Sequence, residues 1–366
     1  MNSATAIQSA LKLPRNEVQP KTIAAGRLQI GDGQPCFITA EIGQNHNGDM
    51  KIAKKLIDMA AFSEASAVKF QKRDVESELS VELCNKPYDN ENSFGKTYGE
   101  HRKFLELTAE QHRELQQYAA EKGILYFCTI CDLPSLNEMA PLDLPLYKVA
   151  SRDITNWPLL EELARFRRPV ILSTGMAGPG EVDAAVDIIT RYHDDFVIAQ
   201  CTSEYPSPPE HCNLTGLRTY RERYGCLVGM SDHTAGVIVA VAAATMGACF
   251  VEKHVTLSRA MRGTDHAGSL EIEGLRRVVG YIRQVEAAMG TGDINFHDYM
   301  APARQKLAKS LSCRRDLSQG EELREEDLEL RCPGTGIRWS DRHRLVGKQA
   351  ACHIDKHNIL DPKDFI

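Results

Sequence analysis

Eight short apolar segments recur over the first 255 residues, and they limit the possible folds more than any other feature of the chain. The segments are 36–42, 67–71, 125–129, 146–150, 169–173, 196–201, 226–230 and 248–252. Stretches of helical length lie between most of them, and residues 271–289 have the length of a closing helix. Apolar strands that alternate with helices are typical of a parallel sheet covered on its faces. The pattern therefore predicts an α/β fold, a (β/α)8 TIM barrel. An open doubly wound sheet is the alternative, although no Gly-x-Gly-x-x-Gly turn supports it.

The chain is long enough for a second, smaller domain. Its 366 residues exceed the roughly 250–300 at which a single core stops growing. We expect an N-terminal arm over 1–29, the barrel over 30–289, a linker over 290–305 and a small β-rich domain over 306–366. Within the last of these, residues 317–328 align with residues 354–365 at an offset of 37 residues. This repeat predicts two hairpin-like units related by pseudo-symmetry.

Composition excludes several classes of protein. The net charge of −6 gives no electrostatic reason for binding nucleic acid or a membrane surface. No apolar stretch approaches the roughly 20 residues that span a bilayer, and residues 1–26 lack the apolar core of a signal peptide. The 11 cysteines include several inside apolar segments, which favours reduced thiols in a cytoplasmic enzyme.

Polar side chains stand at the carboxyl end of every predicted strand, where barrel enzymes carry their active residues. They are Glu41, Lys69, Gln71, Thr129, Lys148, Ser151, Asp153, Ser173, Ser203, Tyr205, Ser231, His233, Glu252 and His254. A long insertion, residues 73–107, follows the second strand, and we expect it to form a mobile flap over the mouth of the barrel.

Two kinds of chemistry are compatible with these side chains. Lys69 and Lys148, with the hydroxyl groups around them, suit a phosphate or a carboxylate, unless each lysine simply pairs with a local acid. His233 and His254 end neighbouring predicted strands and could share a divalent metal. Acids near this pair are Glu41, Asp153, Glu252 and Asp265. An aldol-type attack on an aldehyde by a phosphorylated three-carbon compound fits these groups, and a metal-dependent hydrolase fits nearly as well.

Several segments together resemble one known family. They are Ala40-Glu-Ile-Gly-Gln-Asn-His-Asn-Gly48, Val68-Lys-Phe-Gln71, Tyr147-Lys-Val-Ala-Ser151, Leu172-Ser-Thr-Gly-Met176, Cys201-Thr-Ser-Glu-Tyr-Pro206, Ser231-Asp-His-Thr234 and Glu252-Lys-His254. In this order they resemble the sialic acid synthases. The tail, with Pro333-Gly-Thr-Gly-Ile337, resembles the antifreeze-like (SAF) domain of that family.

The resemblance implies an activity and its components. That family condenses phosphoenolpyruvate with an amino-sugar aldehyde, commonly N-acetylmannosamine, to give N-acetylneuraminate and phosphate. It also implies a divalent metal, Mn²⁺ before Mg²⁺ or Co²⁺. The implied assembly is a homodimer in which each antifreeze-like domain closes the active site of its partner.

The resemblance further assigns roles to individual residues. His233 and His254 would bind the metal and, with Glu41 and Asp265, form the catalytic set. Phosphoenolpyruvate would be held by Lys69, Thr129, Lys148, Ser151, Ser173, Ser203 and Ser231. The sugar would contact Gln71, Asp153, Tyr205 and Arg331.

Two positions depart from the family pattern and leave the acceptor open. Cys332 stands where an arginine that recognises the N-acetyl group is common, and Arg331 is one place earlier, which in an extended segment points to the other face. Arg152 stands where glycine is more usual and adds a charge near the mouth. A legionaminate-type or other surface-polysaccharide precursor is therefore an alternative product. A catalytically silent sugar-binding barrel is a third hypothesis. A 3-deoxy-octulosonate-phosphate type synthase would share the barrel and phosphoenolpyruvate, but such enzymes lack the antifreeze-like tail, so this hypothesis ranks lowest among the synthases.

Overall fold

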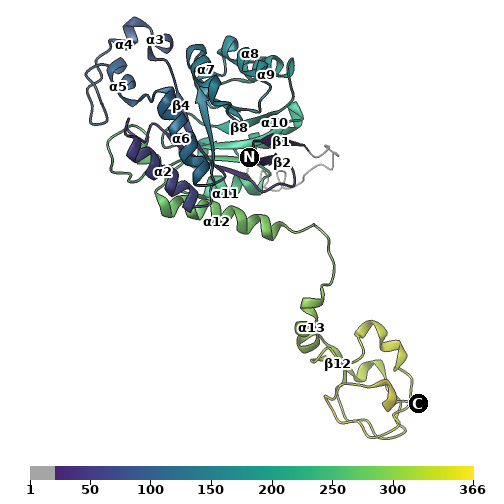
Figure 1. The fold of residues 1–366 in the computed structure, drawn as a ribbon. Helices are drawn as coiled ribbons and strands as arrows, with labels where there is room; N and C mark the ends of the chain where they lie inside the picture. Colours follow the sequence, from purple (N-terminus) through teal and green to yellow (C-terminus); the bar gives the residue numbers. More distant parts are fainter. Residues whose placement is uncertain (1–20) are drawn as a thin grey trace. The chain divides into compact units, whose positions relative to one another are not determined.

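The computed structural model describes residues 21–366, and the chain divides after Gly290 into two compact units (Figure 1). The first unit contains a closed barrel of eight parallel strands. The strands are β3 (Phe37–Gly43), β4 (Ala67–Lys72), β5 (Leu125–Ile130), β6 (Tyr147–Val149), β7 (Val170–Ser173), β8 (Phe196–Cys201), β9 (Leu227–Asp232) and β10 (Phe250–His254). They follow one another in chain order, and β10 pairs with β3 to close the ring. This confirms the predicted (β/α)8 fold, with strand ends within two residues of those expected.

Helices follow the strands and cover the outside of the barrel. They are α2 (Met50–Phe62), α6 (Ala109–Glu121), α7 (Leu133–Met139), α8 (Trp157–Arg165), α9 (Pro179–Thr190), α10 (Gly216–Tyr224), α11 (Ile238–Thr245) and α12 (Ile272–Met289). Outward-facing strand residues and the inner faces of these helices form one large apolar core. The start of α6 is a capping box in which Thr108 and Gln111 satisfy each other's backbone N–H groups, as the sequence indicates.

A hairpin fills the amino-terminal end of the barrel, where the sequence suggested only an arm. Its strands β1 (Thr22–Ala25) and β2 (Leu28–Gly31) pair antiparallel. Ile23 and Ile30 are buried in a second apolar cluster with residues from inside the barrel, including Phe37 and Phe250, whose rings stack at 6.1 Å. Because this end is packed with apolar side chains, the polar strand ends at the opposite side are left to form the site.

The insertion after β4 is built of three short helices: α3 (Val75–Glu78), α4 (Val81–Cys84) and α5 (Tyr98–Leu105). Figure 1 shows them grouped beside the barrel at the upper left. Helix α5 begins with a capping box between Thr97 and Glu100, which fixes its start. The segment predicted as a flap thus contains helices, and α5 brings Tyr98, His101 and Arg102 to the barrel mouth.

The second unit has its own small core. Strands β11 (Ser310–Cys313) and β12 (Leu328–Arg331) pair antiparallel, and the first residues of the two repeats, Leu317 and Ile354, bridge to each other and are buried. Helix α13 (Ala301–Leu307) lies where the sequence suggested linker and strand. Pro302 in its first turn and the helix-favouring residues after it explain this difference.

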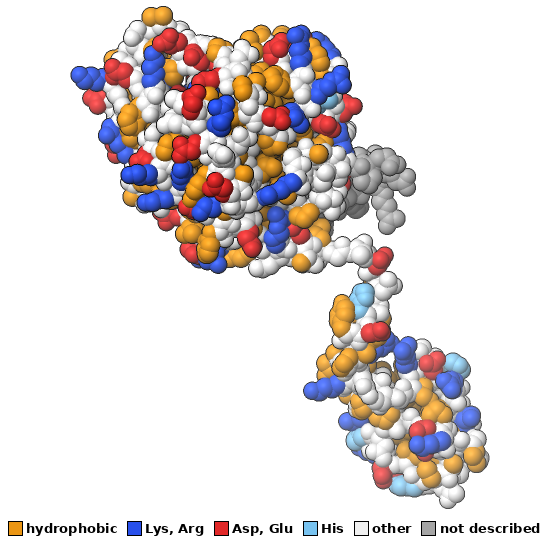
Figure 2. Space-filling view, viewed as in Figure 1, with side chains coloured by type: hydrophobic (Ala, Val, Ile, Leu, Met, Phe, Trp, Pro, Cys, Tyr) orange, Lys and Arg blue, Asp and Glu red, His pale blue; other side chains and the backbone are white. Residues whose placement is uncertain are grey.

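The molecular surface agrees with the charge balance of the sequence. Figure 2 shows basic and acidic side chains interspersed over the visible face of the first unit. Among residues 21–366, no helix has the length and apolar character needed to cross a membrane.

Candidate active site

One cavity of about 260 Å³ lies at the carboxyl ends of the barrel strands. All of the predicted site residues except Asp153 and Arg331 line it. They are Glu41, Lys69, Gln71, Thr129, Lys148, Ser151, Ser173, Ser203, Tyr205, Ser231, His233, His254 and Asp265. Residues that are far apart in the sequence meet here because parallel strands of a barrel end at the same rim.

The alternation of side chains along β9 and β10 explains how the two histidines reach the cavity. Glu252 and His254 are two residues apart, so they share the inner face of β10, while Lys253 points the other way. Behind the site, Lys253 Nζ donates to Asp232 Oδ2 at 3.1 Å and to the backbone oxygen of Thr234 at 2.7 Å. This buried contact ties the end of β10 to the end of β9.

Both predicted anion-binding lysines are held in a network of buried acids. Lys69 Nζ lies 2.6 Å from Thr129 Oγ1, 2.9 Å from Glu41 Oε2 and 3.6 Å from Glu252 Oε2. Lys148 Nζ lies 3.4 Å from Glu252 Oε1. The alternative that each lysine pairs with an acid therefore describes the ligand-free site, and Glu252 connects the two lysines.

The pKa values of the two carboxylates in this network are shifted in opposite directions. Burial raises the pKa of Glu41 to about 6, against the opposing charge of Lys69. Burial acts on Glu252 in the same direction, but the charges of Lys148 and Lys69 outweigh it and hold the pKa of Glu252 at about 2. Glu252 is therefore the more fully ionised of the two, and Glu41 is the one whose pKa is raised toward neutrality.

The two histidines lie side by side, and their surroundings suit a metal. Their ring centroids are 5.5 Å apart. His233 Nδ1 faces the backbone oxygen of Thr202 at 2.7 Å, which places its proton on Nδ1 and leaves Nε2 as an acceptor for the hydroxyl of Tyr205 at 3.0 Å. His254 Nδ1 is buried without a hydrogen-bond partner and lies 3.8 Å from Asp265 Oδ2. Imidazole nitrogens beside a carboxylate fit a divalent transition-metal ion.

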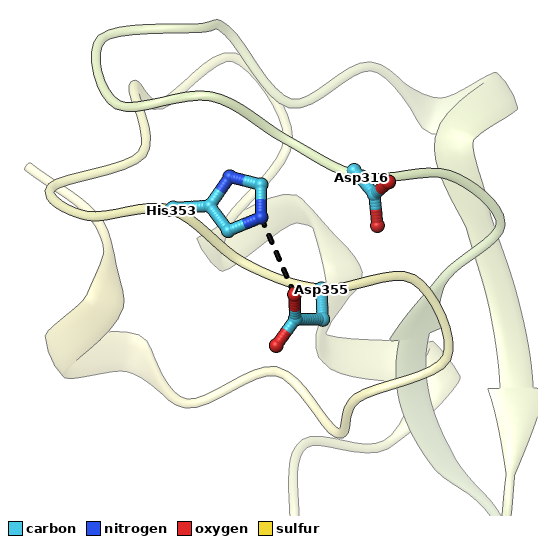
Figure 3. A group of neighbouring side chains, drawn as sticks. All are labelled: Asp316, His353 and Asp355. Atoms are coloured by element: carbon cyan, nitrogen blue, oxygen red, sulfur yellow. Dashed lines mark ion pairs between the residues drawn. The ribbon is translucent and has the colours of Figure 1, made fainter.

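A second group of potential ligands lies in the other unit. Asp316, His353 and Asp355 approach one another on neighbouring segments of its surface (Figure 3). All three are exposed, and His353 Nε2 lies 3.3 Å from Asp355 Oδ1. Their exposure makes this an ordinary surface cluster, in contrast to the buried histidine pair of the barrel.

The hydroxyl groups of Ser151 and Ser203 lie close to the backbone of Gly175. Ser173 Oγ is buried without a hydrogen-bond partner, and Ser151 Oγ accepts from the backbone N–H of Gly175 at 2.9 Å. A Cβ atom at Gly175 would lie 2.5 Å from Ser203 Oγ, so only glycine leaves this corner of the cavity open.

Two predicted residues are not part of this lining. Asp153 belongs to the 3₁₀ turn Ser151–Asp153 and is outside the cavity lining, with its carboxylate 3.4 Å from Arg152 Nε. Successive residues of such a turn point in different directions, so only the first two reach the cavity. Arg331 lies on β12 of the second unit, where its Nε is 2.6 Å from Glu329 Oε1.

Sequence reasoning left several lining residues without a role. They are Gln44, Tyr88, Tyr98, His101, Arg102, Arg152, Met176, Cys201, Glu252 and Thr264. Glu252 was named in the sequence among the acids near the histidine pair but was given no role, although its spacing of two residues from His254 places both side chains on one face of the strand. The residues of the insertion could not be predicted, because no motif shows where an insertion folds.

The comparisons with known proteins agree with this geometry. A model of the NeuB family matches residues 56–294. The chain is 35% identical over 333 residues to N-acetylneuraminate-9-phosphate synthase of Homo sapiens, covering 90% of this chain and 93% of that protein. It is 36% identical over 336 residues to N,N'-diacetyllegionaminic acid synthase of Legionella pneumophila, covering 90% and 94%. Among solved structures, an N-acetylneuraminic acid (sialic acid) synthetase from Leptospira borgpetersenii superposes with a TM-score of 0.69 at 31% identity, covering 78% of this chain and 95% of that one.

Proposed function

The chain belongs to the NeuB family and is a nonulosonate synthase, and we propose that it condenses phosphoenolpyruvate with an N-acetylmannosamine-type aldose. The products are a nine-carbon 2-keto-3-deoxy acid, N-acetylneuraminate for N-acetylmannosamine itself, and inorganic phosphate. The relatives differ in the products that their names give, N-acetylneuraminate 9-phosphate in one and N,N'-diacetyllegionaminic acid in another. A legionaminate-type acceptor is therefore the second candidate.

One group of cavity residues suits phosphoenolpyruvate. Lys69 and Lys148 supply positive charge, and the free hydroxyl of Ser173 supplies a donor without a competing partner. Thr129, Ser151, Ser203 and Ser231 line the same cavity, and Thr129 Oγ1 lies 2.6 Å from Lys69 Nζ. Charged and hydroxyl donors that converge in a buried site bind phosphate and carboxylate strongly.

Other groups of the same lining suit the open-chain sugar, with Gln71, Tyr205 and Asp265 available to hold its hydroxyl groups. His233 and His254 would hold the divalent cation, Mn²⁺ first and Mg²⁺ or Co²⁺ as the other candidates. When bound, such an ion supplies a Lewis acid at the aldehyde oxygen.

The acids of the network explain the bond changes. C3 of phosphoenolpyruvate forms a bond to the aldehyde carbon, the aldehyde oxygen takes a proton, and positive charge develops at C2. The Glu252 carboxylate stabilises this charge. Water then adds at C2 and gives a proton to Glu41, whose raised pKa suits a general base. The bond from C2 to the phosphate oxygen then breaks, and the proton of the C2 hydroxyl goes to the departing phosphate. The proton on Glu41 returns to solvent and balances the one that the aldehyde oxygen took from solvent, leaving the keto acid and hydrogen phosphate.

We also propose the assembly and location that the resemblance implies. In a homodimer, the antifreeze-like unit of one chain would cap the active site of the other and bring Arg331 and Cys332 near the acceptor. All 11 cysteines are free and most are buried, which supports a reducing compartment such as the cytoplasm.

The observation that carries the proposal is the buried cavity in which both lysines, both histidines and the partnerless Ser173 hydroxyl meet. Phosphate release from phosphoenolpyruvate, measured after EDTA treatment with and without Mn²⁺, tests it. The acceptor panel should hold N-acetylmannosamine, mannose and a 2,4-diacetamido-2,4,6-trideoxyhexose. We expect metal-dependent release that requires an N-acetylated aldose. Absence of release with every aldose, together with no stabilisation against heat by Mn²⁺ and phosphoenolpyruvate, would favour a silent sugar-binding barrel.

A further inference from the structure

One buried arginine beside the active site has no part in the reaction described above. Arg73 comes directly after β4, the strand that carries Lys69 and Gln71. Its side chain is fully buried. Burying a guanidinium is costly unless partners satisfy its charge and its five N–H donors, so the contacts of Arg73 indicate its role.

Two of these contacts are with acids of the insertion. Arg73 Nη1 lies 3.3 Å from Glu106 Oε1, and Arg73 Nε lies 3.5 Å from Glu78 Oε2. Neither nitrogen has a hydrogen-bond partner among residues 21–366, so these are ion pairs without aligned hydrogen bonds. Glu78 is also shared, because Arg102 and Arg152 approach its Oε1 at 3.5 Å and 3.1 Å. The acids offset the charge of Arg73, but a hydrogen bond of its guanidinium goes instead to a residue of the active site.

The partner in that hydrogen bond is Gln71, which lines the cavity. Arg73 Nη2 donates to Gln71 Oε1. On the other side of the amide, Gln71 Nε2 donates to Glu41 Oε1 at 2.7 Å. A guanidinium has donors only, so the amide atom that faces it must be the oxygen. The nitrogen then faces Glu41, and the hydrogen bond to Arg73 determines which way round the amide lies.

The backbone next to the amide leaves room for this arrangement. Gly43 has a φ of +53°, and a Cβ atom there would lie 3.0 Å from Glu41 Oε1 and 3.1 Å from Gln71 Nε2. The register between β3 and β4 shifts at the same place, between Glu41 and Gly43. The strands are therefore shaped so that the hydrogen bond from Gln71 to Glu41 fits. The reverse orientation of the amide would place its oxygen against the Glu41 carboxylate, where two acceptors meet without a donor.

The other oxygen of Glu41 is held as well. Lys69 Nζ lies 2.9 Å from Glu41 Oε2. With Gln71 on one oxygen and Lys69 on the other, the plane of the carboxylate is fixed. A base that removes a proton from water has to be held in place, because a displacement of about 1 Å can slow a reaction about 100-fold. The second N–H of Gln71 Nε2 is not used by this contact and can donate to a hydroxyl oxygen of the aldose.

We infer that Arg73 is a positioning residue for the synthase reaction. It orients the amide of Gln71, and that amide holds Glu41 in the position from which Glu41 accepts a proton of the water that attacks C2. This inference rests on the proposed function. Arg73 is not part of the cavity lining, so it acts through Gln71.

A double-variant cycle tests this chain of contacts. Arg73→Met and Gln71→Met should each lower kcat by about tenfold or more. Each should change the KM for phosphoenolpyruvate by less than about twofold, since neither residue is assigned to that substrate. If Arg73 acts through Gln71, the double variant should have the kcat of Gln71→Met alone. Losses that multiply in the double variant would overturn the inference, because Arg73 would then act by another route.

Glu106→Gln is the matched control for the structural part of the contacts of Arg73. It removes the charge that faces Arg73 Nη1 and keeps a side-chain oxygen for the backbone N–H of Arg73, which lies 3.1 Å from Glu106 Oε2. Glu106 does not line the active-site cavity. We expect a lower unfolding temperature with kcat unchanged. A loss of kcat equal to that of Arg73→Met would show that packing of the insertion is the cause and would overturn the inference.

A second variant keeps the inference testable if Arg73→Met does not fold. Gln71→Glu keeps an oxygen for Arg73 and adds a charge to that contact, but it replaces the N–H that faces Glu41 with a second carboxylate oxygen. We expect kcat at saturating aldose to fall by about 100-fold or more. An unchanged kcat in Gln71→Glu would overturn the inference, because the N–H of Gln71 would then not be needed to hold Glu41.

Unfolding temperatures separate the inference from the proposed function, because they require no turnover. Arg73→Met and Gln71→Met remove the two halves of one charge-assisted hydrogen bond, so the double variant should lose less than the sum of the two single losses. Additive losses would overturn the inference whether or not the enzyme turns over. Losses that are not additive, combined with no product from any aldose, would contradict the proposed function and support the contact between Arg73 and Gln71.

Discussion

At the scale of single residues, Glu252 determines much of the electrostatics of the site. Its carboxylate contacts both lysines and accepts from Ser231 Oγ at 3.0 Å. The motifs in the sequence predict that Lys69 and Lys148 face one cavity. They do not show which acid each lysine meets, because that depends on side-chain packing across strands distant in the sequence.

Replacing Glu252 should separate binding from chemistry. In Glu252→Gln the two lysines lose an anionic partner, so phosphoenolpyruvate should bind as tightly as before or more tightly. The positive charge at C2 would lose its stabilising anion, and kcat should fall by about 100-fold or more. Steady-state kinetics give both constants, and Glu161→Gln on the outer helix α8 is a control for removing an acid outside the cavity, where the Glu161 side chain is 42% exposed. An unchanged kcat would contradict the role of Glu252.

The two candidate metal groups can be compared directly. His254→Ala should abolish Mn²⁺ binding and turnover and cause little unfolding, because His254 Nδ1 makes no hydrogen bond in the protein. His353→Ala, in the exposed cluster of the second unit, should leave the Mn²⁺ affinity unchanged. Titration calorimetry measures the binding. Full Mn²⁺ affinity in His254→Ala would place the metal elsewhere.

At the scale of secondary structure elements, the site depends on how the ends of β9 and β10 are joined. The eight strands could be predicted from the sequence because each is a continuous apolar run before a polar end. The hairpin β1–β2 and helix α13 could not, since four to seven residues carry too little periodicity and are stabilised mainly by tertiary packing.

Removing the buried ion pair of Lys253 and Asp232 should weaken the connection between the ends of β9 and β10. Both side chains are about 1% exposed, so Lys253→Met leaves a buried carboxylate without its partner. We expect a loss of about 3–5 kcal/mol in stability, seen as a lower unfolding temperature, and weaker Mn²⁺ binding because His233 and His254 follow on these strands. The double variant Lys253→Met with Asp232→Leu should recover much of the unfolding temperature. No difference between the single and double variants would show that the buried charge is not the cause.

At the scale of the whole molecule, buried histidines make the stability of the folded chain depend on pH. Burial lowers the pKa of His46 to about 4 and of His112 to about 3, whereas an unfolded histidine titrates near 6.5. Below about pH 6.5 the unfolded chain therefore binds protons that the folded chain cannot, and stability is lost as pH falls toward the folded values. Each histidine contributes up to about 1.4 kcal/mol per pH unit in this window.

The first unit should accordingly have a lower unfolding temperature at pH 5 than at pH 7. His112→Gln should make this pH dependence less steep, while His343→Gln, which changes an exposed histidine of the second unit, should not. Differential scanning calorimetry between pH 4.5 and 7.5 measures both profiles. A profile for His112→Gln that is as steep as that of the unchanged protein would contradict the role assigned to this histidine.

The molecule as a whole could be predicted only in part. The division into a barrel and a small β-rich unit follows from the change in sequence pattern near Gly290. The presence of Arg102 beside Arg152 in the cavity lining could not be predicted, because it depends on how α5 folds against the barrel mouth. Arg152 was noticed as a departure from the family pattern, but its neighbours at Glu78 were not.

The fate of the bridging oxygen of phosphoenolpyruvate tests the central claim most directly. With [2-¹⁸O]phosphoenolpyruvate, Mn²⁺ and the preferred aldose, mass spectrometry of both products should show one nonulosonate formed per phosphate, with the label in the phosphate. That result requires cleavage between C2 and oxygen that is coupled to bond formation at C3, as the arrangement of Glu41, Glu252 and the lysines predicts. Pyruvate and phosphate formed without an aldose, or label retained in the keto acid, would contradict it.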